Sequence, residues 1–449
     1  MLCPNCNEEI QYNRSMVSVG DVVPTRMEKI KRTNWAANIM YDGAFHEMTA
    51  IKEIPALVQS LEKVTAVGTG HTFNHIADSP CNQISLRLLH EVSTFDEVSR
   101  TVTVQAGITY DQLCPYLEDR GFAVHNLASL IQLSVVGACS TATHGSGDKN
   151  GNLATSVSSL EMVTADGELV KLSRHNDDDF FAVLVGLGAF GVITQLTLDI
   201  QPAFDIEQYV YERLPFDQLR DHFDAIMASA YSVSVFTDWQ DQQNNEIWVK
   251  SRVGDGEKFE ATREFFGATL ATQKLHPVRN LPAETCTEQM GIPGPSFERL
   301  PHFRMGCTPS VGEELQSEYF MPRHHAAGAI LALQGLSDEI TPNVFVSEIR
   351  TVAADEFWMS TCHHRASVAI GFTWKPDWPA IKSLLPKIES VLAPFDPRPH
   401  WGKLFHFSPA ELHSKYEKMD DFVQLASKYD PKGKFRNEFL SSYIFTPCS

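Results

Sequence analysis

The sequence lacks the features that place a protein in or across a membrane. It has no uninterrupted run of roughly 18 apolar residues, the length that a membrane-spanning helix needs. Its first residues, MLCPNCNEEIQYNRS, contain neither the basic segment nor the apolar segment of a secretory signal peptide. We therefore expect no membrane span and a cytoplasmic location.

Cysteines that could form a disulfide framework or a metal site are also lacking. The nine cysteines are scattered and odd in number, as is typical of reduced thiols. Cys3 and Cys6 form a Cys-x-x-Cys pair, but no second pair of cysteines or histidines with zinc-site spacing follows nearby. Because a structural zinc site needs four ligands, we predict no metal site.

Positive charge is in short supply as well. The 37 Lys and Arg residues are outnumbered by 56 Asp and Glu residues, and the formal net charge is −19. Such a chain is repelled by nucleic acid and by anionic membrane surfaces, so neither is expected as a partner. With 449 residues, 43% hydrophobic and 21% charged, the chain has an ordinary globular composition and is long enough for two cores.

The spacing of apolar residues predicts an α+β protein with two domains. Up to about residue 204, short strands alternate with glycine-rich turns, and longer strands separated by helices follow. The expected strands are 63–67, 101–106, 160–163, 168–172, 191–200, 231–239, 246–253, 344–352 and 367–374, and the expected helices are 111–121, 326–336 and 378–392. Pro202 and Pro215 bracket the boundary. We assign 1–32 to a disordered extension, 33–204 to the first domain and 205–449 to the second, whose end can return to the first.

A glycine loop follows the first of these strands. Gly68 and Gly70 permit positive φ and leave backbone N–H groups open to a pyrophosphate, and His71 comes next. The loop is not a Rossmann fingerprint, because Phe73 stands where the third glycine belongs, and it is not a P-loop. Taken alone, such a loop is more often a tight turn with an exposed histidine.

A second segment is rich in small and hydroxylated residues. Residues 126–129 and 134–147, the latter reading SVVGACSTATHGSG, carry too few large apolar side chains to build a core. This composition suits backbone wrapped around a large, planar, polar ligand. The alternative is a loop of small residues at a domain interface.

Charged residues stand on two otherwise apolar segments. In the strand 344–352, alternation places Val344, Val346, Glu348 and Arg350 on one face. A carboxylate and a guanidinium are costly to bury there unless they meet each other or a polar ligand, although a surface ion pair is an equal alternative. Lys403 lies in an aromatic setting, where a solvated lysine is the usual interpretation.

The strand 367–374 has two different faces. One face carries Ala369, Gly371 and Thr373, and it is small and polar, as a pocket wall would be. The other carries Ile370, Phe372 and Trp374, which we assign to a core.

Together these motifs resemble the vanillyl-alcohol-oxidase/p-cresol-methylhydroxylase (PCMH) type of FAD enzymes, and within it the alditol (xylitol) oxidases and their aldonolactone-oxidase relatives. The matching segments follow one another in a single order over about residues 33–445: 33–36, 67–74, 126–147, 188–194, 348–355, 372–374, 400–403 and 430–440. The resemblance implies a PCMH-type FAD-binding domain followed by a substrate-capping α+β domain.

The resemblance also implies the cofactor and its site. FAD would be bound covalently through an 8α-histidyl bond to His71. The residues implied to line FAD are Ala66, Val67, Gly68, Thr69, Gly70, His71, Thr72, Ser129, Ser134, Gly137, Thr141, Ala142, Thr143, His144 and Ile193.

The implied activity is oxidation of a primary hydroxyl of an alditol such as xylitol or sorbitol to the aldose. The hydride passes to flavin N5, and O₂ is reduced to H₂O₂. We expect the protein to be a monomer. The implied substrate-binding residues are Ser129, Glu348, Arg350, Gly371, Thr373 and Lys403. Lys403 and Arg350 would stabilise the developing alkoxide, and Glu348 would orient Arg350.

One matched position departs from the alditol-oxidase pattern: Gly371 stands where those enzymes carry histidine. The departure removes a hydrogen-bonding partner and opens volume, which leaves the substrate undecided. The alternative activity is that of an aldonolactone oxidase or dehydrogenase of the L-gulono- or D-arabinono-1,4-lactone type. The third possibility is a flavin-storing protein without catalytic activity, which the presence of Glu348, Arg350 and Lys403 disfavours.

Overall fold

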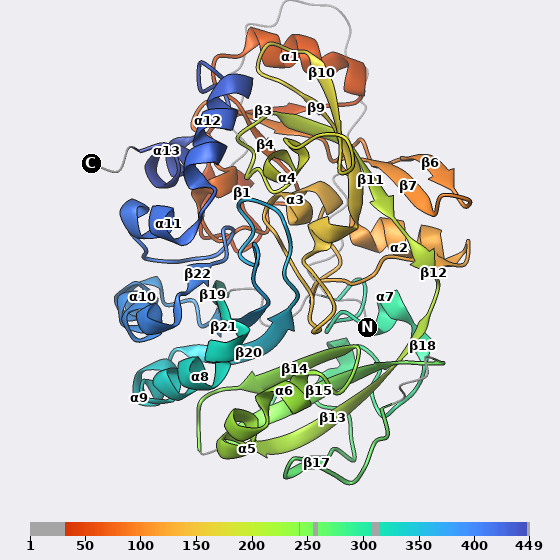
Figure 1. Cartoon of the computed structure of the whole chain (residues 1–449), viewed down its shortest axis with the longest axis vertical. Coiled ribbons are helices and arrows are strands. Elements are labelled where there is room, and N and C mark those ends of the chain that lie inside the picture. The colour runs from red at the N-terminus through yellow and green to blue at the C-terminus, as the bar shows by residue number, and fades with distance from the viewer. Residues whose placement is uncertain (1–31, 242, 255–258, 308–313, 447–449) are drawn as a thin grey trace, which may run out of the picture.

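The computed structural model describes residues 32–446 except 242, 255–258 and 308–313. The Cys3–Cys6 pair and residues 1–31 lie outside this part of the chain. Arg32, which the sequence assigns to the extension, belongs to a short strand with Thr33. Figure 1 shows two groups of elements, an upper one formed by residues up to about 200 together with the C-terminal helices, and a lower one formed by the residues in between.

The upper domain contains two main sheets. In the five-stranded sheet the order is β10-β9-β11-β7-β6, all antiparallel, and in the three-stranded sheet it is β3-β5-β4, all parallel. Its elements are β1 (Arg32–Thr33), β2 (Met40–Tyr41), β3 (Ala44–Glu47), α1 (Ile54–Ser60), β4 (Thr65–Val67), β5 (Asn82–Ser85), β6 (Val92–Asp96), β7 (Thr101–Gln105), α2 (Tyr110–Glu118), β8 (Phe122–Ala123), α3 (Val135–Ser140), β9 (Val157–Val163), β10 (Leu169–Ser173), α4 (Phe180–Val183), β11 (Val192–Asp199) and β12 (Gln201–Pro202).

Local sequence explains several of these elements. In β7, Val102 and Val104 point into the core, while Thr101, Thr103 and Gln105 are half-buried, as the period of two predicts. A capping box formed by Thr109 and Gln112 begins α2. The Asp166-Gly167 pair is a strong signal for a tight hairpin turn, and it lies in the turn between the antiparallel strands β9 and β10, where Gly167 has a φ of 82°.

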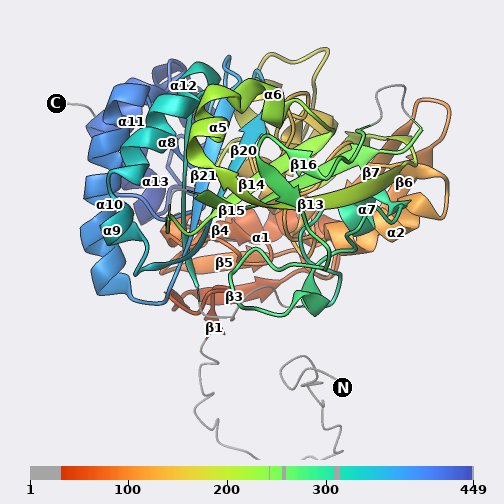
Figure 2. The same cartoon turned by 90° about the horizontal axis from the view of Figure 1, so that it is seen from below.

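The lower domain is built on one ten-stranded sheet, whose main path runs β16-β17-β13-β15-β14-β20-β21-β19-β22. Helices α5, α6, α8 and α10 lie next to one another and cover one face of it (Figures 1 and 2). Its elements are β13 (Asp205–Pro215), α5 (Phe216–Asp221), α6 (Phe223–Met227), β14 (Ser232–Thr237), β15 (Gln243–Arg252), β16 (Glu264–Phe265), β17 (Ala268–Leu270), β18 (Gly294–Pro295), α7 (Ser296–Arg299), β19 (Leu315–Pro322), α8 (Ala326–Gln334), α9 (Ser337–Ile340), β20 (Val344–Val352), β21 (Ser367–Trp374), α10 (Trp378–Leu392) and β22 (Arg398–Pro399).

Three features differ from the sequence-based expectation. Strand β13 fills most of the segment between Pro202 and Pro215 and was not expected, while the change of sheet lies at the beginning of that segment, between Pro202 and Asp205. Strand β19 was not expected at all. In β20 the register shifts between Val344 and Val346, so Val344 packs in the large core with Ile349 and does not share the face of Glu348 and Arg350.

The end of the chain lies against the upper domain (Figure 1). This segment contains α11 (Pro409–Lys415), α12 (Met419–Tyr429) and α13 (Glu438–Tyr443). The Val64 N–H donates to the Lys434 carbonyl at 3.0 Å, and the Asn437 side chain donates to the backbone carbonyls of three residues of the upper domain, His75, Ile76 and Asp78. Both ends of the described chain therefore contribute to one domain.

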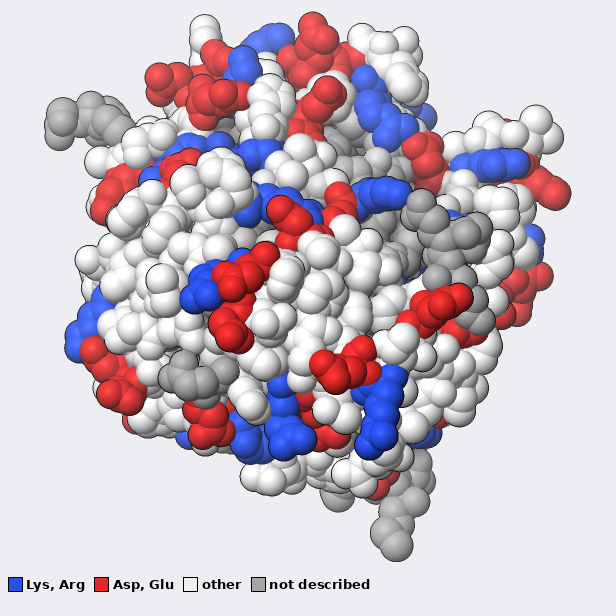
Figure 3. All heavy atoms as spheres, turned by 60° about the horizontal axis from the view of Figure 1, so that its bottom comes forward, with Lys and Arg blue, Asp and Glu red and all other residues white. Residues whose placement is uncertain are grey.

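Acidic and basic side chains are interspersed over the face shown in Figure 3, which turns the bottom of Figure 1 toward the viewer. Among the described residues, no helix combines the length and the apolar character needed to cross a membrane.

Candidate functional site

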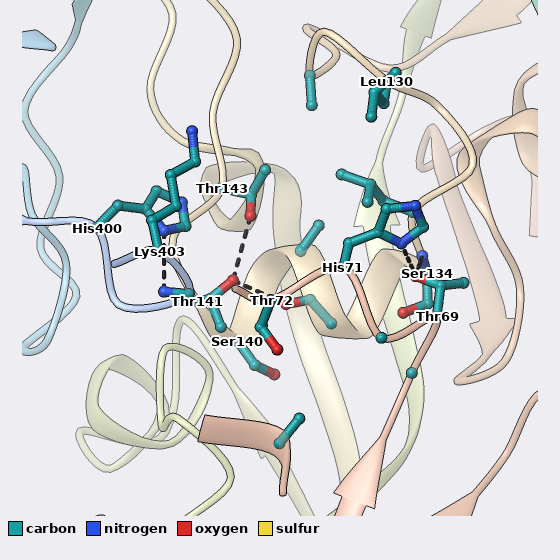
Figure 4. A pocket seen from close by; sticks show the side chains of 18 of the residues that line it. Thr69, His71, Thr72, Leu130, Ser134, Ser140, Thr141, Thr143, His400 and Lys403 are labelled. Atoms are coloured by element: carbon teal, nitrogen blue, oxygen red, sulfur yellow. Dashed lines mark hydrogen bonds between the residues drawn. The ribbon is translucent and has the colours of Figure 1, made fainter. Parts of the chain in front are cut away.

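A cavity of about 340 Å³ lies between the two domains, within the size range of small-molecule sites. One end is lined by the glycine loop and by residues of the segments 130–144 and 186–193, all of the upper domain. The other end is lined by residues of β19, β20 and β21 and by His400, Gly402 and Lys403. Figure 4 shows His71, Thr69 and Ser134 on one side of the pocket and His400 and Lys403 on the other, with Thr141 and Thr143 between them.

The glycine loop presents unpaired backbone donors to this cavity. Gly70 has a φ of 70°, a conformation that glycine adopts without strain. Among the described residues, none accepts a hydrogen bond from the backbone N–H groups of residues 68–72. Successive N–H groups of this kind form an anion-binding concavity, so the loop fits a phosphate or pyrophosphate group.

His71 stands at the end of this loop with a defined orientation. Its ring stacks on Trp35 with centroids 5.4 Å apart, and its Nδ1 lies 2.9 Å from the Thr69 hydroxyl. Burial lowers the pKa of His71 to about 4. The imidazole is therefore neutral at pH 7 and keeps a nucleophilic nitrogen lone pair.

The second segment predicted to line the cofactor also lies at the cavity. Ser134, Gly137, Thr141, Thr143, His144 and Ile193 all line it, as do Ala66, Val67 and Thr72. Ala142 does not: it is fully buried at φ 53°, while its neighbours Thr141 and Thr143 join their hydroxyls at 3.2 Å. The side chain of Ala142 packs in the core, so any contact of this residue with the cofactor stays a prediction.

The predicted substrate-binding residues are brought together at the other end. Ser129, Glu348, Arg350, Gly371, Thr373 and Lys403 all line the cavity, although they come from four separate segments. The Arg350 guanidinium donates to the Ser129 hydroxyl at 3.4 Å. Its Nε lies 3.5 Å from Glu348 Oε1, an ion pair without a hydrogen bond.

The principal partner of both cations is Glu318 on β19, which sequence reasoning missed. Arg350 Nη2 donates to Glu318 Oε1 at 2.7 Å, and Lys403 Nζ donates to Oε2 at 2.9 Å. His144 Nε2 lies 3.3 Å from Oε1. The Glu318 side chain is 1% exposed. A glutamate inside the short run Leu315–Pro322 was the available signal, because a buried strand rarely holds an unpartnered carboxylate.

A second set of buried polar contacts, made by His302 and Lys250, leads to Glu348. His302 Nε2 lies 2.7 Å from Glu348 Oε1, and Lys250 Nζ lies 3.2 Å from His302 Nδ1. Lys250 also donates to the Pro301 carbonyl at 3.0 Å. Burial lowers the pKa of Lys250 to about 7 and that of His302 to about 4. A neutral His302 thus donates to Glu348 and accepts from Lys250.

The two carboxylates at this end remain ionised. Burial alone would raise the pKa of Glu318, but Lys403, His144 and Arg350 hold it well below 4.5. For Glu348, burial is likewise outweighed by Arg350 and His302, and its pKa is lowered. Burial lowers the pKa of His400 to about 3 and raises that of Glu314 to about 7.

One group of possible metal ligands, His363, His364 and Glu417, occurs among the described residues. Both histidines lie 2.9 Å from the same carboxylate oxygen, and none of the three residues lines the cavity.

Comparison with known proteins finds family models that match the segments lining each end of the cavity. A family model described as FAD binding domain matches residues 46–173, which include the glycine loop and the segment 126–147. A model described as D-arabinono-1,4-lactone oxidase matches residues 301–443, which include Glu318, Glu348, Arg350 and Lys403.

Several relatives match over nearly the whole chain. An alditol oxidase of a Streptomyces species is 43% identical over 92% of this chain and 98% of its own length. An L-gulono-1,4-lactone dehydrogenase of Mycobacterium tuberculosis is 28% identical over 84% of this chain and 89% of its own. The solved structure of cholesterol oxidase from B. sterolicum has the same fold, with a TM-score of 0.76, 14% identity and coverage of 92% of this chain and 96% of that one.

Proposed function

This chain belongs to the FAD-dependent family of alditol oxidases and aldonolactone oxidases, and we propose that it oxidises a primary hydroxyl group of a polyol to the aldose. The observation that carries the proposal is one cavity with unpaired backbone donors and His71 at one end and Arg350, Lys403 and hydroxyl side chains at the other. The 43% identity to an alditol oxidase favours a polyol over a lactone.

The cofactor side of the cavity fits FAD. Backbone N–H groups of residues 68–72 would hold the pyrophosphate, and Ser134, Gly137, Thr141 and Thr143 would line the remainder. When bound, FAD supplies a hydride acceptor at N5. Our proposal includes a covalent bond from a His71 ring nitrogen to the flavin 8α carbon, which the neutral state of His71 supports.

The substrate end can bind a polyhydroxylated chain and stabilise its reacting oxygen. The hydroxyls of Ser129 and Thr373 can exchange hydrogen bonds with substrate hydroxyls, and Glu348 can accept from one. Lys403 and Arg350 can stabilise negative charge that develops on the oxygen of the reacting hydroxyl. Their positions are set before the reaction by Glu318, so little reorganisation is needed.

A substrate profile tests this proposal without any assumption about the electron acceptor. The purified protein is mixed anaerobically with xylitol, sorbitol, glycerol, L-gulono-1,4-lactone or D-arabinono-1,4-lactone, and bleaching of the flavin absorbance is followed by stopped flow. We expect rapid bleaching by at least one alditol and slower bleaching by the lactones. Preference for a lactone would favour the aldonolactone activity, for which the match of residues 301–443 is the specific observation. No bleaching by any of them would overturn both.

The proposed electron acceptor is O₂, with H₂O₂ as its product. The test is reoxidation of the substrate-reduced protein by air-saturated buffer, compared with a dye acceptor. We expect reoxidation within seconds in air. Reoxidation over minutes in air but rapid reoxidation by the dye would show a dehydrogenase.

A further inference from the structure

The carboxylate of Glu318 lies where both cations of the substrate end converge. It is placed by β19, which pairs with β21 so that Glu318 lies opposite Gly371. Oε1 accepts from Arg350 and Oε2 from Lys403, so one carboxylate occupies a donor of each cation that the proposed reaction uses. Its side chain is 1% exposed, so water cannot screen these contacts.

Gly371 leaves the room that this carboxylate needs. A Cβ atom at position 371 would lie 3.3 Å from Glu318 Oε1 and 3.6 Å from its Cδ. A larger side chain would therefore meet the carboxylate first, and the space opened by the glycine is bounded by Glu318. The departure from histidine at this position and the buried glutamate form one structural unit.

The ion-paired groups at this end, Arg350, Lys403, Glu318 and Glu348, balance in charge. Arg350 and Lys403 provide two positive charges, and Glu318 and Glu348 provide two negative charges, because both carboxyl pKa values are lowered. His144, His302 and His400 all have lowered pKa values, so they are neutral at pH 7. Glu314, with a pKa of about 7, can only add negative charge to the cavity, and Lys250 lies behind His302.

We propose that Glu318 is a specificity-determining residue, whose charge makes the cavity select neutral polyhydroxylated substrates against sugar acids. Both cations already have a carboxylate partner, so the carboxylate of an aldonate would bring a third negative charge into a poorly hydrated site. Without the charge of Glu318 the same end would carry one unmatched positive charge and would bind an aldonate. The inference rests on the proposed function for the identity of the neutral substrate.

The direct test is Glu318→Gln, which keeps the shape of the side chain and removes its charge. Binding of xylonate is measured by the change in flavin absorbance, and KM and kcat for xylitol are measured in parallel. We expect xylonate to bind about tenfold to a hundredfold more tightly than to the unaltered protein, the range for one hydrogen-bonded charge. The kcat/KM for xylitol should fall in this variant. The gain in affinity for xylonate should become smaller as the salt concentration rises.

Gly371→Ala is the matched control for disturbance without loss of charge. Its Cβ presses on the Glu318 carboxylate, so the KM for xylitol should rise while xylonate affinity stays at the level of the unaltered protein. If Gly371→Ala gained xylonate affinity equally, the effect would come from loosened packing and the proposal would be wrong. Unchanged xylonate affinity in Glu318→Gln, or xylonate binding to the unaltered protein as tight as xylitol binding, would also overturn it.

A second variant tests the same charge balance by removing a positive charge while Glu318 is kept. Lys403→Met leaves one negative charge unmatched, so the cationic polyol 1-amino-1-deoxysorbitol should gain affinity relative to sorbitol. Equal affinities of the two ligands in this variant would count against the charge balance. The deciding readouts of both tests are binding affinities, for xylonate and for the amino polyol, so they remain informative if the profile of polyols and lactones shows that the proposed oxidation is wrong.

Discussion

At the scale of single residues, the two ends of the cavity differ in the groups that they present. The glycine loop offers backbone donors, and its one reactive side chain is His71, held by Trp35 and Thr69. The substrate end instead concentrates charge, with Glu318 between Arg350 and Lys403. Substitutions at the first end should therefore alter cofactor attachment, and those at the second should alter chemistry.

For His71 we predict loss of covalent flavin on substitution by alanine. After acid precipitation, flavin absorbance and fluorescence should remain with the unaltered protein and should pass into the supernatant for His71→Ala. His75→Ala is the matched control, because His75 lies four residues further on and does not line the cavity. Free FAD released from the unaltered protein would show that no covalent bond exists.

For Lys403 we predict a large loss of rate on substitution by methionine, which keeps much of the length and removes the charge. Removing one preorganised charge from a transition state costs on the order of 10² to 10³ in rate. Anaerobic flavin reduction by the preferred substrate should slow by about that factor, with an unaltered flavin spectrum. Lys382→Met, an exposed change on α10, serves as control. An unaffected reduction rate in Lys403→Met would place this lysine outside the chemistry.

At the scale of elements, strand β19 owes its position to contacts on both of its faces. One face carries Glu318 into the cavity. On the other, the Tyr319 hydroxyl donates to Glu389 of α10 at 2.9 Å, and the His406 N–H donates to the same oxygen at 2.6 Å. Burial raises the pKa of Glu389 from 4.5 to about 7. The helix thus holds the strand through a carboxyl group that prefers its protonated form.

This arrangement predicts a pH dependence of stability. Because the folded protein holds the Glu389 proton more tightly than the unfolded chain, the stability associated with this proton is fully present below about pH 4.5 and is lost as pH rises through about 7. Glu389→Gln mimics the protonated form. Its melting temperature should exceed that of the unaltered protein at pH 8, and the difference should shrink as pH falls toward 4.5. A difference that is constant with pH would contradict the assignment.

At the scale of the whole molecule, the domain that contains the glycine loop is closed by the end of the chain. Asn437 is the clearest contact, because its side chain donates to the carbonyls of His75, Ile76 and Asp78 and accepts from the Leu440 N–H at the start of α13. Residues more than 350 positions apart in sequence are joined there. The stability of the cofactor side of the cavity therefore depends on the C-terminal segment.

Substitution of Asn437 by alanine should destabilise the protein by about 2 to 4 kcal/mol, because it removes a helix cap and leaves buried carbonyls without a donor. The measurement is the free energy of unfolding in urea, followed by flavin fluorescence and by circular dichroism. Lys432→Ala, an exposed change in the same segment, should leave the free energy within about 0.5 kcal/mol of its original value. A loss for Asn437→Ala no larger than for Lys432→Ala would show that this contact does not hold the domain.

The sequence by itself was sufficient for those features that depend on neighbouring residues. The alternation of Val102 and Val104 predicts β7, the Asp166-Gly167 pair predicts the β9–β10 hairpin, and α10 has the predicted bounds. Local motifs predicted the glycine loop, and family resemblance predicted the substrate residues, which line the same cavity. A turn, a strand or a helix is visible in the sequence because its signal is contained in a few consecutive residues.

Only the tertiary structure decided what depends on residues distant in sequence. It showed that Glu318, and not Glu348, accepts hydrogen bonds from Arg350 and Lys403, although 32 and 85 positions separate these residues. A register shift in β20 turned Val344 away from Glu348, and a turn buried Ala142. The physical reason is the same in each case: a charge is paired, and a side chain faces a cavity or a core, according to the strands and loops that folding brings beside it.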